Sequence, residues 1–223
     1  MTGVSVAVLR SIPAFEALDA VRLETLSRMA SLRHAARGST VLHEGDRTDN
    51  IYFIVNGVLK VLVSDDEGRE VILSILGSGE LFGEMGVLDD HPRSATVIAT
   101  QSSDLVVVPK SDFQRFLSSS FDVSLYIMRG LVKRLRLADR KIESLALLDV
   151  YGRVARLLLD LAETRDGRQV VAKVTKQDIA KMIGASREMV SRVMKELEQQ
   201  GLIFDEDGQI ILREDLGTDA RET

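Results

Sequence analysis

Residues 79–96 read Gly-Glu-Leu-Phe-Gly-Glu-Met-Gly-Val-Leu-Asp-Asp-His-Pro-Arg-Ser-Ala-Thr, and this stretch decides how the N-terminal half of the chain is interpreted. A glycine-rich turn around Gly83 lets backbone N–H groups approach an anion closely. Arg93 offers a planar fork for phosphate oxygens, and Ser94 adds a hydroxyl. The Glu84 carboxylate would repel phosphate, so a sugar hydroxyl is its natural partner. The stretch therefore predicts a cradle for a phosphate fused to a ribose; the alternative is a turn in which Glu84 and Arg93 form only a salt bridge.

Composition limits the classes of protein that fit this chain. Its 223 residues are 45% hydrophobic, which is enough for two small packed domains. The formal net charge of −5 argues against a non-specific DNA coater, but it allows a specific binder with one basic face. No apolar run approaches a membrane span, and residues 1–10 lack the basic start of a signal peptide, so we expect a cytoplasmic protein without a membrane partner.

Cysteine and histidine usage argues against metal centres. The chain has no cysteine, which excludes disulfides and cysteine-ligated iron–sulfur clusters. Its three histidines, His34, His43 and His91, are scattered and show no metal-ligand spacing. We expect no metal and no cofactor, and interpret His91 as a solvent-exposed turn residue.

The pattern from Gly38 to Pro109 is typical of an all-β unit. Short runs with a period of two predict strands at Thr40–His43, Ile51–Val55, Val58–Val63, Glu70–Leu76, Ala95–Ala99 and Leu105–Val108. Asn56-Gly57 between two apolar runs is a strong hairpin signal. Many short strands at regular spacing indicate a barrel or roll. Before them, Asp19–Leu32 is predicted to be a helix, with one apolar side formed by Val21, Leu23, Leu26, Met29 and Ala30.

A long helix is predicted from Val123 to Leu148. Its apolar residues step by three and four in alternation, as in a heptad seam: Met128, Leu131, Leu135, Ala138, Ile142 and Leu145. Basic residues flank the seam: Lys133, Arg134, Arg136, Arg140 and Lys141. An amphipathic helix lying on its own core would explain the apolar side alone. The regular spacing and the basic flank favour a parallel homodimer.

The C-terminal part carries the signals of a helix-turn-helix followed by a β-wing. A helix over 149–164, a turn at Asp166-Gly167 and a strand at Gln169–Val174 lead to Thr175, which we expect to be an N-cap with Asp178 three residues on. Gly184 makes the tight turn and Ser186 caps the next helix. Its buried stripe is predicted to be Val190, Val193, Met194 and Leu197. Residues 201–212 read as the wing, and the tail after Asp215 is polar.

The opposite face of this second helix has the side chains of a major-groove reader. It carries Arg187, Glu188, Ser191, Arg192 and Lys195. Arg can donate twice to guanine, and Glu can accept from cytosine N4. Gln177 and Ser186, near helix starts, suit phosphate contacts, as does Thr175. A solvated face with an i, i+4 Glu–Arg pair is the alternative. The caps, the glycine turn and the wing favour DNA.

From about residue 12 to residue 213, the chain resembles the cyclic AMP receptor protein/FNR family of bacterial regulators. The matching motifs are Gly83-Glu84, Arg93-Ser94-Ala95, Leu148-Asp149-Val150-Tyr151-Gly152-Arg153 and Gly184-Ala185-Ser186-Arg187-Glu188-Met189-Val190-Ser191-Arg192. The resemblance implies an α+β fold: an N-terminal β-roll (a cyclic-nucleotide-binding jelly roll), a long dimerisation helix and a C-terminal winged helix-turn-helix. We place the β-roll domain at 1–118, the dimerisation helix at 119–148, the DNA-binding domain at 149–216 and a tail at 217–223.

The resemblance also implies roles for residues. Gly83, Glu84, Arg93, Ser94 and Ala95 match the phosphate and ribose contacts. Val61 and Leu73 match apolar positions near the base, and Arg134 matches on the long helix. Arg187, Glu188 and Arg192 match the base-reading trio, which implies a two-fold site similar to TGTGA. RNA polymerase is implied as a partner, although Glu163–Gln169 is shorter than the family's polymerase-touching loop.

One departure concerns the effector. Cyclic AMP receptors have a Thr-Ser pair on the long helix where this chain has Ala138 and Asp139. Ala138 removes a hydroxyl, and Asp139 accepts hydrogen bonds only and adds negative charge. Cyclic AMP, cyclic di-GMP and nucleotide-independent control therefore stay open.

We read the chain as a homodimeric, effector-responsive transcription regulator that is not an enzyme. One rival is a cyclic-nucleotide sensor that controls an enzyme or channel, which would not need the pattern over Thr175–Leu197. A second rival is an enzyme using Glu84 or Asp139, but no nucleophile–base pair, metal cluster or Walker-type loop accompanies either residue in the sequence.

Overall fold

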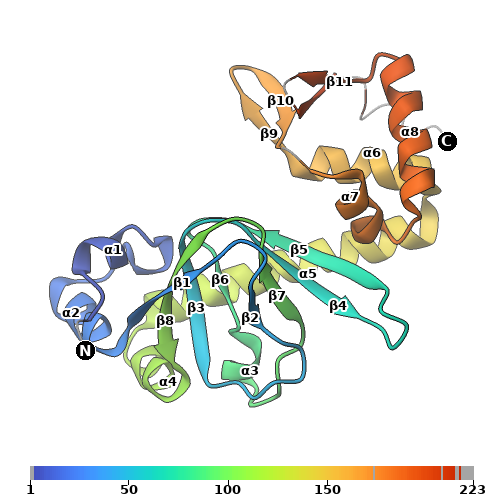
Figure 1. Ribbon diagram of the computed structural model, residues 1–223. Helices are drawn as coiled ribbons and strands as arrows, with labels where there is room; N and C mark the ends of the chain where they lie inside the picture. Colours follow the sequence, from blue (N-terminus) through green and yellow to red (C-terminus); the bar gives the residue numbers. More distant parts are fainter. Residues whose placement is uncertain (1–2, 173, 207, 214–215, 217–223) are drawn as a thin grey trace. The chain divides into compact units, whose positions relative to one another are not determined.

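The computed structural model describes residues 3–172, 174–206, 208–213 and 216 (Figure 1). The chain falls into two compact units, Met1–Lys133 and Arg134–Thr223, and the boundary between them lies inside one long helix. Each unit has its own hydrophobic core. The predicted tail over 217–223 lies outside the described residues.

The first unit is built around a pair of four-stranded antiparallel sheets, as expected for a β-roll (Figure 1). One sheet has the order β1 (Ser31–Ala35), β8 (Ser103–Pro109), β3 (Asn50–Asn56), β6 (Leu81–Phe82). The other has the order β2 (Thr40–Leu42), β7 (Thr96–Ala99), β4 (Leu59–Ser64), β5 (Glu70–Leu76). The predicted strands are thus present, and β1 and β6 are additions that the period-two pattern did not indicate.

Strands β3 and β8 are apolar on both faces because each face meets a different core. Tyr52 and Ile54 belong to the cluster that also contains Leu59 and Val97 of the other sheet. Ile51 and Phe53 belong to a second cluster, shared with the helices of this unit. A strand buried on both faces reads as a continuous apolar run instead of an alternating one.

Helices cover the outer face of the β1–β8–β3–β6 sheet. They are α1 (Val6–Arg10), the 3₁₀ turn η1 (Pro13–Phe15), α2 (Ala20–Met29), α4 (Lys110–Ser118) and the start of α5 (Phe121–Leu147), and their apolar side chains pack with those of β3 and β8. A shorter helix, α3 (Met85–Leu88), lies in the predicted cradle. The sequence patterns indicated neither α1, α3 nor α4.

The prediction of a helix over Asp19–Leu32 was wrong at its C-terminal end. Asp19 caps α2, but the helix ends at Met29, and Leu32 lies in β1 paired with Val106. Val21 is 73% exposed and does not belong to the buried side. Pairing with β8 satisfies the backbone of this segment, so a tertiary contact overrides the local helical period.

The hairpin predicted at Asn56-Gly57 was also wrong. Strand β3 pairs with β6 and β8, whereas β4 pairs with β5 and β7, so the chain changes sheets at this point. Gly57 has φ = 119°, and a Cβ here would lie 2.1 Å from Ser103 Oγ. The glycine therefore serves a close approach between β-segments. The turn over 65–69 is a true hairpin turn, joining β4 to β5.

The second unit packs helices against a four-stranded sheet of order β11-β12-β10-β9. Its elements after α5 are α6 (Val150–Leu161), β9 (Ala162–Arg165), β10 (Arg168–Val171), α7 (Lys176–Ile183), α8 (Arg187–Gln199), β11 (Ile203–Glu206) and β12 (Gln209–Leu212). The expected winged helix-turn-helix is thus present. Asp207, in the predicted wing turn, lies outside the described residues.

Two predicted boundaries in this unit were wrong. The helix expected over 149–164 ends at Leu161, and residues 162–165 form β9, which pairs with β10. Asp166 and Gly167 between them have φ = 50° and 75°, as a tight hairpin turn requires. The strand expected at Gln169–Val174 is β10, which ends at Val171, and Lys173 lies outside the described residues.

The long helix α5 spans 27 residues, close to the predicted bounds. Most of its predicted seam is open to solvent: Met128 is 47% exposed, Leu135 62%, Ile142 66% and Leu145 57%. Leu131 instead packs against the core of the first unit. Among the helices of the described residues, none has the length and apolar character needed to cross a membrane.

Candidate functional site

The predicted cradle begins where β6 ends. Gly83 follows Phe82 with φ = 77°, in the left-handed region that glycine adopts without strain. A Cβ at this position would lie 2.6 Å from Arg93 Nη1. Gly83 is therefore required both for the turn and for the approach of the Arg93 guanidinium.

Arg93 is buried, with 6% of its surface exposed. Its Nη1 donates to the Gly83 carbonyl at 2.9 Å, and its Nη2 donates to the Asn50 carbonyl at 2.7 Å. The guanidinium carbon lies 5.8 Å from the centre of the Tyr52 ring. Burial lowers the pKa of Arg93, whereas Tyr52 and nearby carboxylates oppose this shift. The fork predicted to face an anion is thus partly engaged with backbone carbonyls.

The same guanidinium keeps capacity for a further acceptor. A guanidinium has five N–H donors, and among the described residues that of Arg93 makes two hydrogen bonds. Among the described residues, its buried Nε has no hydrogen-bond partner. An unused donor on a buried charge is costly, and such groups often mark a functional site.

Glu84 is also buried, at 2% exposure, and it directly precedes α3. Its carboxylate is among the charges that favour the protonated form of Arg93. Ala95 is 8% exposed, whereas Ser94 is exposed, with its hydroxyl 3.7 Å from Met85 Sδ. The structure thus brings Gly83 and Arg93 into direct contact. Within the part of the chain that the structure describes, the Ser94 hydroxyl has only a weak sulfur acceptor.

The residues predicted near a base lie on the β4–β5 pair. Val61 pairs with Ser74 and packs against the core between the sheets. Leu73 falls at the register shift opposite Val61 and Leu62, and it is 44% exposed. Ala138 and Asp139, both exposed, and Arg134, half-buried, lie on the part of α5 that belongs to the second unit. Their role as ligand contacts stays a prediction.

The helix-turn-helix is formed as its caps predicted. Asp178 N donates to Thr175 Oγ1 at 3.0 Å, and Met189 N donates to Ser186 Oγ at 3.1 Å. Gly184 ends α7 in the left-handed conformation, with φ = 64°. These bonds satisfy helix-end donors. The hydroxyl oxygens of Thr175 and Ser186 therefore already accept a hydrogen bond from the backbone. A contact with a DNA phosphate would have to be made by the same hydroxyl groups.

Helix α8 has the two faces that its sequence predicted. Val190, Val193, Met194 and Leu197 are all buried. On the other side, the Glu188 and Arg192 side chains are 86% and 76% exposed and lie 3.5 Å apart. Ser191 is half-buried, and its hydroxyl donates to the Arg187 carbonyl at 2.8 Å. Gln177, Arg187 and Lys195 are exposed. A helix whose apolar face is buried and whose other face exposes a row of polar and charged side chains can present that row to a DNA major groove.

Two side chains that support this helix pair were missed as functional. Arg153 Nη1 donates to the Ile183 carbonyl at 3.0 Å, at the end of α7, and the Tyr151 hydroxyl donates to Gln200 Oε1 at 2.7 Å, just beyond α8. Both come from α6, within the motif at Leu148–Arg153. The motif was the available signal, but nothing in its spacing indicated which backbone group Arg153 would reach.

These two units define a class of protein: a β-roll in which a glutamate and an arginine are both buried, joined to a winged helix-turn-helix. Residues 32–120 match the cyclic nucleotide-binding domain, and residues 152–216 match the Crp-like helix-turn-helix domain. The chain belongs to the CRP/FNR family of transcription regulators, a family of DNA-binding proteins that are not enzymes.

Individual relatives are similar over most of their length. The cAMP-activated global transcriptional regulator Vfr of Pseudomonas aeruginosa is 37% identical over 195 residues, which cover 82% of this chain and 90% of Vfr. The cAMP-activated regulator CRP of Salmonella typhimurium is 37% identical over 172 residues, or 74% of this chain and 81% of CRP. The c-di-GMP responsive regulator CLP of Xanthomonas campestris matches in structure with a TM-score of 0.74 and 29% identity, covering 87% of this chain and 99% of CLP.

One surface arrangement resembles a hydrolytic triad. Ser102 Oγ lies 3.2 Å from His34 Nε2, and His34 Nδ1 lies 2.9 Å from Asp104 Oδ1. The sequence spacing did not indicate this group, because β1 and β8 are distant in the chain. The His34 and Asp104 side chains are 61% and 52% exposed, so water competes for every bond. In a family of non-enzymes we interpret it as a surface hydrogen-bond chain.

Proposed function

We propose that this chain is a homodimeric regulator whose affinity for DNA is controlled by a cyclic nucleotide held by Gly83, Glu84, Arg93, Ser94 and Ala95. The observation that carries this proposal is the burial of Glu84 and Arg93, which are 2% and 6% exposed. Both lie at the turn made by Gly83, whose φ is in the left-handed region. Charged side chains are almost never buried to this extent without a specific partner. Because burial holds both side chains in place, the Glu84 carboxylate can accept from a ribose hydroxyl and the Arg93 guanidinium can donate to a phosphate.

Cyclic AMP is the first candidate effector, since the regulators Vfr and CRP, both 37% identical to this chain, are cAMP-activated. Cyclic di-GMP is the second, because the CLP structure is that of a c-di-GMP responsive regulator and because Ala138 and Asp139 lack the hydroxyl donors expected for adenine. Isothermal titration calorimetry of the purified protein with cyclic AMP, cyclic GMP and cyclic di-GMP separates these cases. Absence of heat with all three would overturn nucleotide control.

We infer that the DNA site is a two-fold TGTGA-like sequence read by Arg187, Glu188 and Arg192, with Thr175, Gln177, Ser186, Ser191 and Lys195 as further contacts. The exposed charged face of α8 supports this assignment. An electrophoretic shift with a TGTGA palindrome, with and without nucleotide, tests it. Equal affinity for a scrambled palindrome would contradict it. A ligand shifts the DNA equilibrium only by its difference in affinity for the two states, so both titrations are needed.

The homodimer is proposed from the exposed seam of α5. Met128, Leu135, Ile142 and Leu145 are 47% to 66% exposed at heptad spacing, and water-exposed apolar rows of this kind mark helix–helix interfaces. Analytical ultracentrifugation of wild type and Leu135→Asp should give a dimer and a monomer, respectively. A monomeric wild type would remove the seam from the proposal. A cytoplasmic location and contact with RNA polymerase belong to the same proposal.

A further inference from the structure

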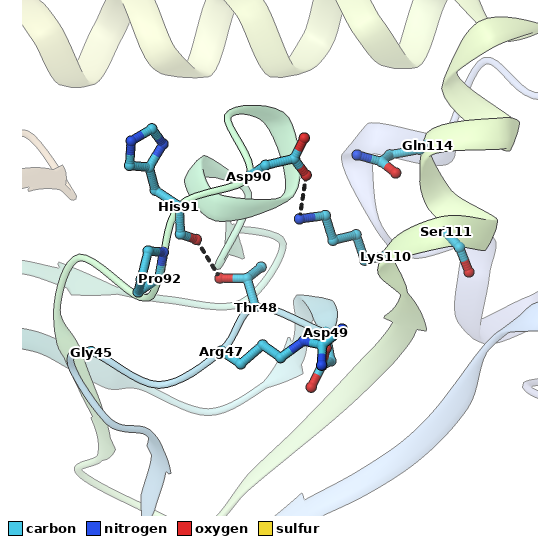
Figure 2. A pocket seen from close by; sticks show the side chains of 10 residues that line it. All are labelled: Gly45, Arg47, Thr48, Asp49, Asp90, His91, Pro92, Lys110, Ser111 and Gln114. Atoms are coloured by element: carbon cyan, nitrogen blue, oxygen red, sulfur yellow. Dashed lines mark hydrogen bonds and ion pairs between the residues drawn. The ribbon is translucent and has the colours of Figure 1, made fainter.

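A polar cavity of about 680 Å³ lies beside residues 86–91, which we call the cradle loop and which comprise the end of α3 and the turn that follows it (Figure 2). Thr48, Asp90, His91, Lys110 and Gln114 are among the side chains that line it. They come from three separate places: the β2–β3 connection, the α3–β7 loop and helix α4. The β2–β3 connection and α4 therefore meet the α3–β7 loop at this cavity, although each is distant from it in the sequence.

Side chains from outside the loop bind its backbone at consecutive points. Lys110 Nζ donates to the Gly86 carbonyl at 2.9 Å and pairs with Asp90 Oδ1 at 2.6 Å. Gln114 Nε2 donates to the Val87 carbonyl at 2.7 Å, and the Thr48 hydroxyl donates to the His91 carbonyl at 3.0 Å. Every acceptor lies within residues 86–91, between the Gly83-Glu84 turn and Arg93.

The loop is also closely packed and locally strained, so it needs this support. A Cβ on Gly86 would lie 2.3 Å from Thr48 Oγ1. Asp90 has φ = 61°, in the left-handed region that costs non-glycine residues free energy, although aspartate tolerates it better than most. The Arg93 backbone is fixed from the same side, since its N–H donates to the Asp46 carbonyl at 2.8 Å.

Among these contacts, Lys110 is best placed to matter. Its side chain is only 21% exposed, and it makes both a carbonyl bond and an ion pair. The bond to the Gly86 carbonyl is partly buried, whereas the Asp90 side chain is 77% exposed, so the carbonyl bond contributes more than the ion pair. Lys110 is also the first residue of α4, which is followed after Ser119 and Ser120 by α5.

We propose that Lys110, assisted by Gln114 and Thr48, is a positioning residue that clasps the loop 86–91 from behind and thereby sets the affinity of the cradle for its nucleotide. This inference rests on the proposed nucleotide binding. Without the clasp, the loop samples conformations in which Glu84 and Arg93 are no longer aligned for one ligand. The apparent affinity falls in proportion to the fraction of molecules that keep the competent loop.

The test compares Lys110→Met with Arg47→Met. Arg47 lines the same cavity as a cation, but its side chain is 90% exposed and pairs with Asp49, outside the loop. Hydrogen–deuterium exchange of the unliganded protein should show faster exchange of the 86–91 amides in Lys110→Met only, by about tenfold. Calorimetry with cyclic AMP and with cyclic di-GMP should show a Kd about tenfold higher for Lys110→Met, with Arg47→Met unchanged. Lys110→Arg should recover most of the affinity.

A purely structural role would lower the thermal midpoint of the whole unit, so the midpoint of Lys110→Met must stay within about 2 °C of wild type. Unchanged exchange in the loop, or faster exchange with an unchanged nucleotide Kd, would overturn the clasp while leaving the proposed function intact. A wild-type protein that binds none of the nucleotides would overturn the proposed function and, with it, the ligand role of the clasp.

Discussion

The cradle and the reading helix both use a glutamate and an arginine, but in opposite environments. Glu84 and Arg93 are 2% and 6% exposed and sit among backbone groups. The Glu188 and Arg192 side chains are 86% and 76% exposed on α8. Buried charges pay a large desolvation cost and are therefore fixed in one geometry, whereas exposed charges stay hydrated and can rearrange on a partner. A small ligand requires the first arrangement, and a long polyanion tolerates the second.

The largest expected effect comes from Arg93→Ala. It leaves the Gly83 and Asn50 carbonyls without their donors and removes a charge close to Glu84, so we expect the first unit to lose about 2–4 kcal/mol of stability. Response to any phosphate-bearing effector should disappear. Chemical denaturation measures the loss of stability. A DNA-binding assay at increasing nucleotide concentration measures the loss of response.

Arg192→Ala is the matched control for this comparison. It removes the exposed arginine of the other pair, and its stability should change by less than about 0.5 kcal/mol. Similar destabilisation by the two variants would contradict the contrast between fixed and hydrated charges. An Arg93→Ala protein that still responds to nucleotide would remove Arg93 from the cradle.

Gly83→Ala should have the next largest effect. The new Cβ meets strain at φ = 77° and lies 2.6 Å from Arg93 Nη1, so the guanidinium must move. Gly68→Ala is an internal control, because Gly68 also has φ = 77° and no neighbouring atom within 4 Å of an added Cβ. We expect about 1 kcal/mol of destabilisation for the control and about 1–2 kcal/mol more for Gly83→Ala. Equal denaturation midpoints for the two variants would show that Arg93 accommodates the methyl group.

On the reading helix, Arg187→Ala should alter recognition without altering stability. We expect a loss of about 1–3 kcal/mol at one G position and relaxed discrimination there, because a bidentate base contact disappears. Lys195→Ala should instead weaken binding on all sequences. A fluorescence-anisotropy series over single-base variants of the palindrome distinguishes them, and uniform weakening by Arg187→Ala would refute its base-reading role.

The smallest effect is expected at the caps of the helix-turn-helix. Thr175→Ala removes the oxygen that accepts from Asp178 N at 3.0 Å. The second unit should lose about 1 kcal/mol, as other N-cap replacements do. Thr175→Ser keeps the acceptor and should retain nearly full stability. If both variants denature at the wild-type midpoint, the cap contributes nothing to the reading helix.

Local chemistry in the sequence was enough to predict the helix-turn-helix and the long helix. Caps, a left-handed glycine and apolar periodicity act over a few residues, so α7, α8 and α5 appear close to their expected bounds. The same holds for β5, whose hairpin with β4 is closed by a short polar turn. Such signals are reliable because each is satisfied within its own segment.

The tertiary structure decided what depends on residues distant in the chain. Strand β3 pairs with β8, some fifty positions later in the chain, and this pairing decides which sheet β3 joins. The hairpin predicted at Asn56-Gly57 is absent for that reason. That Arg93 turns inward to the Gly83 and Asn50 carbonyls, and that Lys110 reaches the loop behind it, depends on side chains meeting across the roll. No local pattern encodes these contacts, because their energy arises only when separate strands and helices exclude water together.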